Sequence, residues 1–275
     1  MALFITIKGK IQQAVRLAFV NSITFLNNSI IIVEYPKSGG SWLGQLVSNY
    51  LGVPFPRNSF PVIVKSVYHS HYLPKYLINR NKKILWMVRD GRDVSVSFYY
   101  HQLIWSDKNR LDPKTVTYSR KNLPFKNYDD IFNNLPKYLE YSFTHSPPKS
   151  HYFNFHGDWS SYNLKWKKEY DKGNGNIYMV KYEDLLNDTK GTLKKIIKDF
   201  LELEVDEKKL NVVINKYSFM NQTKRVNGEE NTRSFLRKGI VGDWKNKFSI
   251  DAKNTYKKYG GEMLKILGYE QNSDW

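Results

Sequence analysis

The sequence contains no cysteine among its 275 residues. Disulfide bonds, thiol catalysis and cysteine-based zinc sites are therefore excluded. It also lacks a run of about 18 apolar residues, the length that a membrane-spanning helix requires. The Gly-Lys-Ser/Thr sequence that ends a Walker A loop is absent too, which argues against the usual ATP- or GTP-binding P-loop.

Acidic residues are scarce relative to basic ones, 26 against 43, and the net charge is +17. Such an excess indicates an anionic partner, which is a phosphorylated cofactor, a polyanion, a nucleic acid or a membrane surface. Lysine runs such as 165–168 are typical of a solvated helix face and explain part of the charge. We expect a phosphorylated ligand and no specific nucleic acid.

The most informative stretch is residues 35–42, with the sequence Tyr-Pro-Lys-Ser-Gly-Gly-Ser-Trp. It lies between an apolar run at 30–33 and a helical pattern at 43–51, which predicts a strand, a tight loop and a helix. Backbone N–H groups in such a loop, together with a helix N-terminus, form an anion site. Its side chains add a cation, two hydroxyls and an indole: Lys37, Ser38, Ser41 and Trp42.

Two further segments carry residues suited to phosphate. An apolar strand pattern at 84–88 is followed by Arg89, and Ser97 comes about two helical turns later. Arginine presents a planar fork of donors that matches phosphate. The tripeptide Arg-Lys-Gly at 237–239 places two cations beside a glycine, whose backbone permits a dianion to approach closely.

In this order, the three segments resemble those of sulfotransferases that use 3′-phosphoadenosine 5′-phosphosulfate (PAPS). Residues 35–42 resemble the 5′-phosphosulfate loop of that family, and Arg89 with Ser97 resembles its 3′-phosphate element. Residues 235–246 are similar to its Arg-Lys-Gly-x-x-Gly-Asp-Trp-Lys-Asn signature. The resemblance implies an enzyme that transfers the sulfuryl group of PAPS to a hydroxyl acceptor by in-line displacement and releases 3′-phosphoadenosine 5′-phosphate (PAP).

The resemblance also implies a set of cofactor-binding residues. These are Lys37, Ser38, Gly39, Gly40, Ser41, Trp42, Arg89, Ser97, Tyr182, Phe219, Arg237, Lys238 and Gly239. Lys37 and Ser97 are expected to act in catalysis as well. The three aromatic residues of the set are expected either to stack on adenine or to pack in the core. Gly40 departs from the family, which usually has threonine there, so we expect weaker cofactor binding.

The general base is expected to be a histidine, which titrates near neutral pH. Many cytosolic members of the family carry it in a Lys-Thr-His-Leu-Pro segment, and residues 65–74 correspond to that segment here. His71 precedes Leu-Pro most closely, with one extra residue between, and His69 is its rival. Some members use a carboxylate, for which Asp90 and Asp93 are candidates. The His-x-His spacing also suits a metal, but with no third ligand in view we expect none.

Strand patterns alternate with helical patterns along the chain. The strands are expected at 30–34, 62–66, 84–88 and 177–181, and the helices at 41–51, 93–102, 160–170, 189–201, 207–217 and 253–267. This alternation predicts an α/β fold, a P-loop-like parallel sheet flanked by helices on both faces in a single domain. Ligands bind at the carboxyl ends of such strands, where Lys37 and Arg89 lie.

The expected domain covers residues 29–275 and follows an N-terminal amphipathic segment at 1–28. We expect that segment to dock on the domain as a helix; the alternative is peripheral membrane contact through residues 1–26. Residues 105–157, rich in lysine, asparagine and aromatics, are expected to be an insert that binds the acceptor and covers it as a lid. The composition favours a cytoplasmic protein.

Three questions stay open at this point. The expected acceptor is a hydroxyl of a carbohydrate, a lipid or a small alcohol or phenol, and the oligomeric state is undetermined. The competing functions are a P-loop phosphotransferase and a non-enzymatic binder of polyanions. Magnesium-dependent ATPase activity would favour the first competitor, and salt-sensitive binding without turnover would favour the second.

Overall fold

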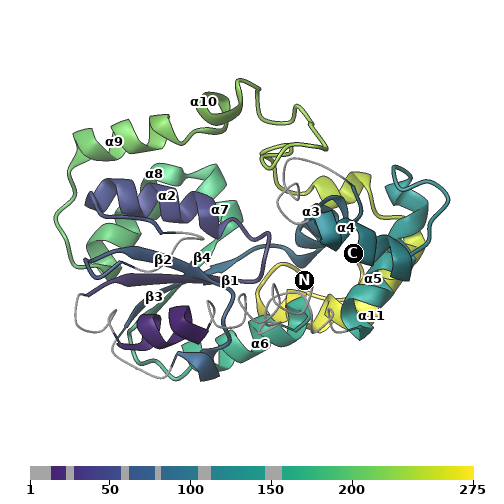
Figure 1. Cartoon of the computed structure of the whole chain (residues 1–275), viewed down its shortest axis with the longest axis horizontal. Coiled ribbons are helices and arrows are strands. Elements are labelled where there is room, and N and C mark those ends of the chain that lie inside the picture. Colours follow the sequence, from purple (N-terminus) through teal and green to yellow (C-terminus); the bar gives the residue numbers. More distant parts are fainter. Residues whose placement is uncertain (1–13, 23–27, 57–61, 78–81, 105–112, 146–156) are drawn as a thin grey trace, which may run out of the picture. The chain divides into compact units, whose positions relative to one another are not determined.

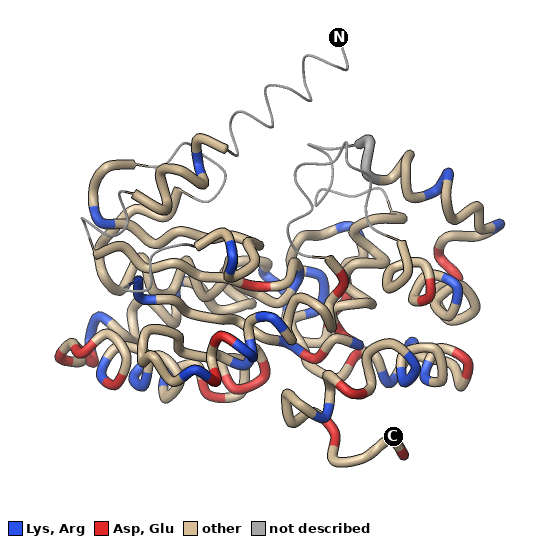
Figure 2. The backbone as a smooth tube through the Cα atoms, turned by 90° about the horizontal axis from the view of Figure 1, so that it is seen from below, with Lys and Arg blue, Asp and Glu red and all other residues tan. Residues whose placement is uncertain are grey.

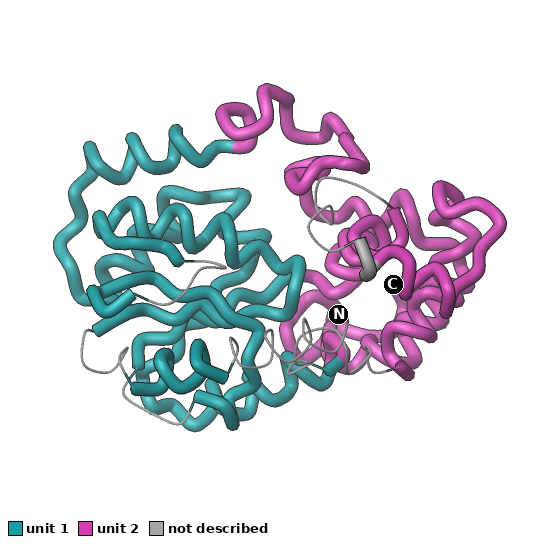
Figure 3. The backbone as a smooth tube through the Cα atoms, viewed as in Figure 1, with its two compact units in different colours: residues 1–89, 147–157, 161–218 teal, residues 90–146, 158–160, 219–275 magenta. Residues whose placement is uncertain are grey.

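The computed structural model describes residues 14–22, 28–56, 62–77, 82–104, 113–145 and 157–275. The chain divides into two compact units (Figure 3). Unit 1 comprises residues 1–89, 147–157 and 161–218, and unit 2 comprises residues 90–146, 158–160 and 219–275.

Unit 1 is built on a parallel sheet with the strand order β2-β1-β3-β4 (Figure 1). The strands are β1 (Ile30–Glu34), β2 (Val67–Ser70), β3 (Lys83–Val88) and β4 (Ile177–Lys181). Every residue of β1 is buried, as expected for a strand that is covered on both faces. Because β1 and β3 are neighbours in parallel register, the segments that follow them emerge at the same edge of the sheet.

Helices cover both faces of this sheet (Figure 1). One face carries α2 (Gly40–Leu51), α7 (Tyr182–Asn187) and α8 (Thr189–Lys195), which continues as a π-helical turn at Ile196–Phe200; α9 (Glu207–Lys216) packs against α2. The other face carries α6 (Trp159–Tyr170) and a helix at 14–22. In α6, Trp166 is buried and its indole N–H donates to the carbonyl of Tyr72 at 3.1 Å. The predicted α/β class with a flanked parallel sheet is confirmed.

Unit 2 is helical in the part that the structure describes. Its helices are α3 (Gly91–Leu103), α4 (Pro113–Asn122), α5 (Ile131–Thr144), α10 (Phe219–Thr223) and α11 (Ile250–Ile266), with a 3-10 turn at Asp243–Asn246. Aromatic contacts join them: the rings of Tyr99 and Tyr138 meet edge to face at 5.2 Å, and Phe143 stacks on Tyr259 at 5.5 Å. These rings of α5 therefore pack within the unit.

The strand predicted at 62–66 is wrong, because β2 is formed by Val67–Ser70. The apolar side chains of Ile63 and Val64 are largely exposed, at 76% and 58%. The Ile30 N–H donates to the carbonyl of Ser66, and the register with β1 begins at the next residue, Val67. The edge strand of the sheet is thus formed by the more polar segment Val-Tyr-His-Ser, and all four of its residues are buried.

The other predicted strands and all six predicted helices are present, with ends shifted by a few residues. Helices α4, α5, α7 and α10 are not among these six. Of these, α4 and α5 lie within the segment 105–157, of which residues 105–112 and 146–156 are outside the described part of the chain. The lid role of that segment stays a prediction.

The described part of the N-terminal segment, residues 14–22, docks on unit 1. Arg16 donates to the carbonyls of Pro56 and His69, each at 3.2 Å, and Val20 is 1% exposed. This agrees with a docked helix for these residues. In the ranges that the structure describes, no helix combines the length and the apolar character needed to cross a membrane.

Candidate functional site

The predicted anion loop connects β1 to α2 at residues 35–39. Lys37 has φ +76° and Gly39 has φ +103°, so two residues of this short loop adopt left-handed conformations. A non-glycine residue is rarely found there, and such strained positions gather at ligand sites. The turn makes Gly39 the N-cap of α2, and because glycine has no side chain, the first N–H groups of the helix are left to other acceptors.

The loop holds a buried hydroxyl that lacks a partner. Ser38 is 1% exposed, and its Oγ has no hydrogen-bond partner among the described residues. An unsatisfied buried hydroxyl costs about 1–3 kcal/mol, so the arrangement is best explained by a ligand that accepts the bond. A hydroxyl, a lysine and a helix start suit a phosphate or sulfate group.

Gly40 donates its N–H to Oε2 of Glu34 at 2.5 Å. A Cβ atom on Gly40 would lie 2.8 Å from Cδ of Glu34 and 3.0 Å from the ring of His69. The space that the family's threonine would need is therefore filled by a buried carboxylate. In this structure the Gly40 N–H is directed at Glu34, so its expected donation to a phosphate stays a prediction.

Three of the predicted cofactor residues, Arg89, Tyr182 and Trp42, meet beside this loop. The guanidinium of Arg89 lies 4.2 Å from the ring centroid of Tyr182, and its Nη1 donates to the carbonyl of Lys37 at 3.4 Å. The rings of Trp42 and Tyr182 meet edge to face at 6.0 Å. The ring of Tyr182 also covers Gly39, where a Cβ atom would lie 2.6 Å from it.

The two candidate histidines differ in their surroundings. His69 lies within β2, is 8% exposed, and donates from Nε2 to Oε1 of Glu34 at 2.7 Å. His71 follows the strand, is partly exposed, and its Nδ1 lies 3.0 Å from the backbone carbonyl of Glu34. A carbonyl only accepts, so Nδ1 of His71 carries a proton, and in the neutral form of the ring Nε2 carries the lone pair. His71 is thus the better placed candidate base.

Glu34 is a site residue that the sequence analysis missed. It is 3% exposed. Burial raises the pKa of its carboxyl, but the hydrogen bond and positive charge of His69, the charge of His71 and the Gly40 N–H together outweigh burial and lower that pKa. One possible metal-ligand atom from Glu34 and from each of the two histidines lie within 4.8 Å of one another. Glu34 could therefore be the third metal ligand that the sequence analysis did not find. The available signal was a lone acidic residue that ends an apolar strand directly before the loop.

In unit 2, both cations of the predicted phosphate clamp at 237–239 pair with carboxylates. Arg237 pairs with Glu230 and, at 2.6 Å, with Asp243. Lys238 pairs with the other oxygen of Asp243 at 2.6 Å. Burial raises the pKa of Asp243, but Lys238 and Arg237 outweigh burial and lower it, which keeps this carboxylate ionised beside the clamp.

The glycine of the clamp lies against an aromatic ring. Gly239 has φ +66°, and a Cβ atom there would lie 2.6 Å from the ring of Phe219. Arg225 lies 5.2 Å from the centroid of the same ring and donates to the carbonyl of Arg237 at 2.9 Å. The structure therefore brings Phe219 and the glycine of the clamp together, while their roles in cofactor binding stay predictions.

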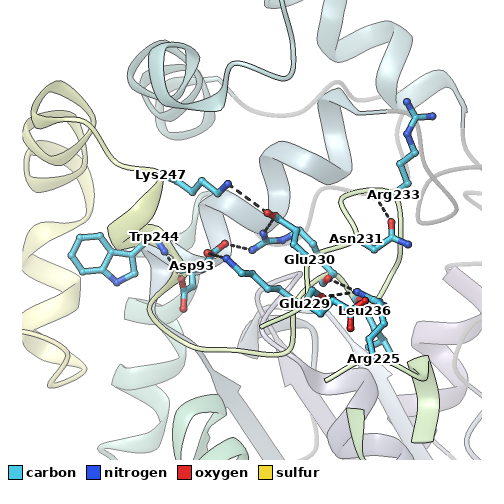
Figure 4. Close-up of polar contacts among 12 residues, drawn as sticks. Asp93, Arg225, Glu229, Glu230, Asn231, Arg233, Leu236, Trp244 and Lys247 are labelled. Carbon is cyan, nitrogen blue, oxygen red and sulfur yellow. Dashed lines mark hydrogen bonds and ion pairs between the residues drawn. The ribbon is translucent and has the colours of Figure 1, made fainter. Parts of the chain in front are cut away.

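Ser97 lies half-buried on α3, four residues after Asp93 and so on the same helix face. Asp93 accepts from the backbone N–H groups of Gly242 and Trp244, at 2.7 and 3.0 Å (Figure 4). Asp90 caps α3 and pairs with Arg92 at 2.7 Å. Both carboxylates thus hold local structure, which makes them poor candidates for the base.

The predicted site residues fall into two groups. Those of unit 1 are Lys37, Ser38, Gly39, Gly40, Ser41, Trp42, His69, His71, Arg89 and Tyr182, and those of unit 2 are Ser97, Phe219, Arg237, Lys238 and Gly239. Elsewhere, Lys and Arg are interspersed with Asp and Glu along the backbone (Figure 2). This mixture is typical of solvated helix faces.

Comparison with known proteins identifies the family. The family model of the sulfotransferase domain matches residues 52–268. Sulfotransferase 1B1 of Canis lupus familiaris is 27% identical over 81% of this chain and 79% of its own length. The 3-beta-hydroxysteroid sulfotransferase of Cavia porcellus is 27% identical over 87% of this chain and 84% of its own.

Solved structures share the fold. Mouse sulfotransferase SULT7A1 complexed with PAP aligns with a TM-score of 0.65 and 19% identity, over 94% of this chain and 91% of that chain. Retinol dehydratase in complex with androsterone and inactive cofactor PAP aligns with a TM-score of 0.59 and 16% identity, over 92% and 86%.

Proposed function

The chain belongs to the sulfotransferase-domain family, and from that premise we propose how its residues bind the donor and which acceptors it takes. It is a sulfotransferase that moves a sulfuryl group from PAPS to a hydroxyl oxygen. The observation that carries the assignment of the donor site is the buried hydroxyl of Ser38, which has no hydrogen-bond partner among the described residues and lies in a strained loop between a parallel strand and the start of α2.

The loop at 35–42 is proposed to bind the 5′ end of the donor. Ser38 and Ser41 supply hydroxyl donors, and the start of α2 supplies backbone N–H groups. Lys37 supplies a charge that stabilises the negative charge developing on the leaving phosphate. The donor supplies the reactive sulfuryl group, and the loop's part is to hold and neutralise it.

The 3′-phosphate and the adenine are assigned to residues of the motifs that resemble those of the family. Arg89, Ser97 and the clamp at 237–239 are proposed to bind the 3′-phosphate through charge-assisted hydrogen bonds. Trp42, Tyr182 and Phe219 are proposed to pack against the adenine, since an aromatic face suits a flat base. The proposal for Tyr182 and Trp42 is supported by their contact with each other at 6.0 Å.

His71 is proposed as the general base. Its Nδ1–H is directed at the carbonyl of Glu34, so Nε2 can accept the proton of the acceptor hydroxyl. A general base of this kind contributes about 10²–10⁴-fold to the rate.

The acceptor is proposed to be a small lipophilic alcohol, such as a hydroxysteroid or a phenol. This rests on the names of relatives, which include a 3-beta-hydroxysteroid sulfotransferase, and on a structural neighbour that holds androsterone. A panel of PAPS-dependent assays with one hydroxysteroid, one simple phenol and one glycan separates the classes. Turnover of the glycan alone would overturn this assignment.

The donor site is tested by calorimetry with PAP, 5′-AMP and ATP with magnesium. We expect wild type to bind PAP at least tenfold more tightly than 5′-AMP, a preference of about 1.4 kcal/mol or more. Arg89→Ala should abolish that preference, whereas Lys37→Ala should weaken the binding of both PAP and 5′-AMP. Tighter binding of ATP with magnesium than of PAP would overturn the donor assignment in favour of a phosphotransferase.

A further inference from the structure

Three acceptor atoms of Glu34 bind three different parts of the candidate site. Oε2 accepts from the backbone N–H of Gly40 at the start of α2, and Oε1 accepts from the ring of His69 in β2. The backbone carbonyl accepts from Nδ1 of His71. The last residue of β1 thus joins the donor loop, the neighbouring strand and the candidate base.

Burying a carboxylate in this position has a high cost in free energy. Glu34 is 3% exposed, and a buried charge costs several kcal/mol unless it is paired and hydrogen-bonded. Its side chain also requires glycine at position 40, because a Cβ there would lie 2.8 Å from its Cδ. A less costly apolar strand end would serve the fold, so this carboxylate calls for another explanation.

The charged and titratable groups around Glu34 come from each element that packs against it. From β2 and its end come His69 and His71, whose rings meet edge to face at 4.8 Å. From α6 comes Tyr162, whose pKa is raised by burial and then by the charge of Glu34, so that it stays neutral. From the helix at 14–22, Arg16 donates to the carbonyl of His69 at 3.2 Å.

We propose that Glu34 is a positioning residue of the transfer site, which fixes the first turn of the donor loop and the orientation of the histidine pair at the same time. Oε2 holds the Gly40 N–H and thereby the loop backbone on which Ser38 and Ser41 are carried. Oε1 holds the His69 ring, which packs against His71. The inference rests on the proposed function of this loop and of His71.

A metal site is the competing explanation for the same three residues, and the geometry speaks against it. The Oε1–Nε2 distance of 2.7 Å is that of a hydrogen bond, with a proton between the two atoms. Two ligands of one tetrahedral zinc, each about 2.0–2.2 Å from the ion, would lie roughly 3.3 Å apart. The three residues still lie close enough to share an ion, so the test also measures zinc binding.

The variant Glu34→Gln keeps the shape of the side chain and removes its charge. Its amide N–H₂ group cannot accept a hydrogen bond, so either the Gly40 N–H or the His69 ring loses its acceptor. His69→Phe removes the ring donor while keeping similar volume. The control is Glu202→Gln, which removes the same charge from a side chain that is 78% exposed. Full-length wild type and variants are compared by thermal unfolding, by calorimetry with PAP, and by NMR of ¹⁵N-labelled histidine rings.

Wild type should show His69 protonated on Nε2 and His71 protonated on Nδ1. Glu34→Gln should bind PAP about tenfold more weakly and lose the hydrogen-bonded signal of the His69 ring. His69→Phe should have a similar effect, and the double variant should lose about tenfold rather than a hundredfold, because both changes break one interaction. Glu202→Gln should bind PAP as wild type does.

Three results would overturn the inference. If Glu34→Gln lowers the melting temperature but binds PAP like wild type, Glu34 is only structural. If wild type binds one zinc ion at micromolar concentration and both variants abolish that binding, the trio is a metal site. If wild type does not bind PAP at all, the proposed function fails and the inference fails with it, whereas equal binding by wild type and Glu34→Gln leaves the proposed function intact.

Discussion

The guanidinium of Arg89 lies over the ring of Tyr182, with Cζ 4.2 Å from the ring centroid. Both residues come directly after paired strand ends, since Val88 of β3 is in register with Lys181 of β4. The parallel sheet therefore places an arginine and a tyrosine side by side at its carboxyl edge. Nη1 of Arg89 also donates to the carbonyl of Lys37, which extends the contact to the loop after β1.

Tyr182→Leu should weaken PAP binding about tenfold, because it removes both a cation–π contact worth about 1–2 kcal/mol and an aromatic face for adenine. Tyr182→Phe keeps the ring and should bind within about twofold of wild type. Calorimetry with PAP measures both. Equal losses in the two variants would show that the hydroxyl, and not the ring, matters.

Glu230→Gln should tighten PAP binding about three- to tenfold, or about 0.6–1.4 kcal/mol. Glu230 pairs with Arg237 and, at 3.6 Å, with Lys247, so an incoming 3′-phosphate competes with this carboxylate for the cations (Figure 4). The matched control is Glu229→Gln, which removes the same charge from the adjacent exposed residue. Weaker binding by Glu230→Gln would contradict the prediction and show that Glu230 orients Arg237 instead.

Most of the fold follows from periodicity and composition. Strands β1, β3 and β4 are short, apolar and bounded by polar segments, which is enough to predict them. The failure at β2 has a physical cause: Val67–Ser70 contains histidine and serine, whose burial is explained by contacts with β1 and not by their own hydropathy. The local pattern favoured 62–66, where Ile63 and Val64 are in fact exposed.

The candidate site was predictable only for residues that belong to a recognisable sequence motif. The loop at 35–42, Arg89 and the clamp at 237–239 were identified because each has a defined order of residue types. Glu34 was not identified, because a single glutamate in the sequence gives no sign that His69, on a strand far along the chain, will lie beside it. The acidic partners of the clamp, such as Glu230, were missed for the same reason.

Gly40→Ala should lower the free energy of unfolding by about 1–3 kcal/mol, the cost of overpacking, because its Cβ would contact Glu34 and His69. In a Glu34→Ala background the same change should cost less, because the contacting carboxyl is absent. Denaturant unfolding of the two single variants and the double variant gives the interaction energy. The control is Gly261→Ala, where the nearest atom would lie 3.8 Å away and where alanine should favour the helix. Additive effects of the changes at residues 34 and 40 would contradict the inference that the Glu34 side chain requires glycine at position 40.

Lys82 provides a prediction about pH. The residue is 2% exposed, its Nζ donates to Oδ1 of Asn21 at 3.0 Å, and burial lowers its pKa to about 8. Because the unfolded chain keeps an ordinary lysine pKa of about 10.4, it binds more protons than the folded chain between pH 8 and 10.4. Stability should therefore rise with pH across this window.

Lys82→Met removes this dependence. Relative to Lys82→Met, wild type should gain about 1–3 kcal/mol of unfolding free energy as the pH rises from 7 to 10.5, because the buried ammonium that destabilises the fold at neutral pH loses its proton. Urea unfolding of both proteins at several pH values measures the difference, and the titration of other groups cancels between them. The control, Lys208→Met, replaces an exposed lysine and should show a parallel curve to wild type. A constant difference between wild type and Lys82→Met over this range would mean that Lys82 titrates at the same pH in the folded and the unfolded chain.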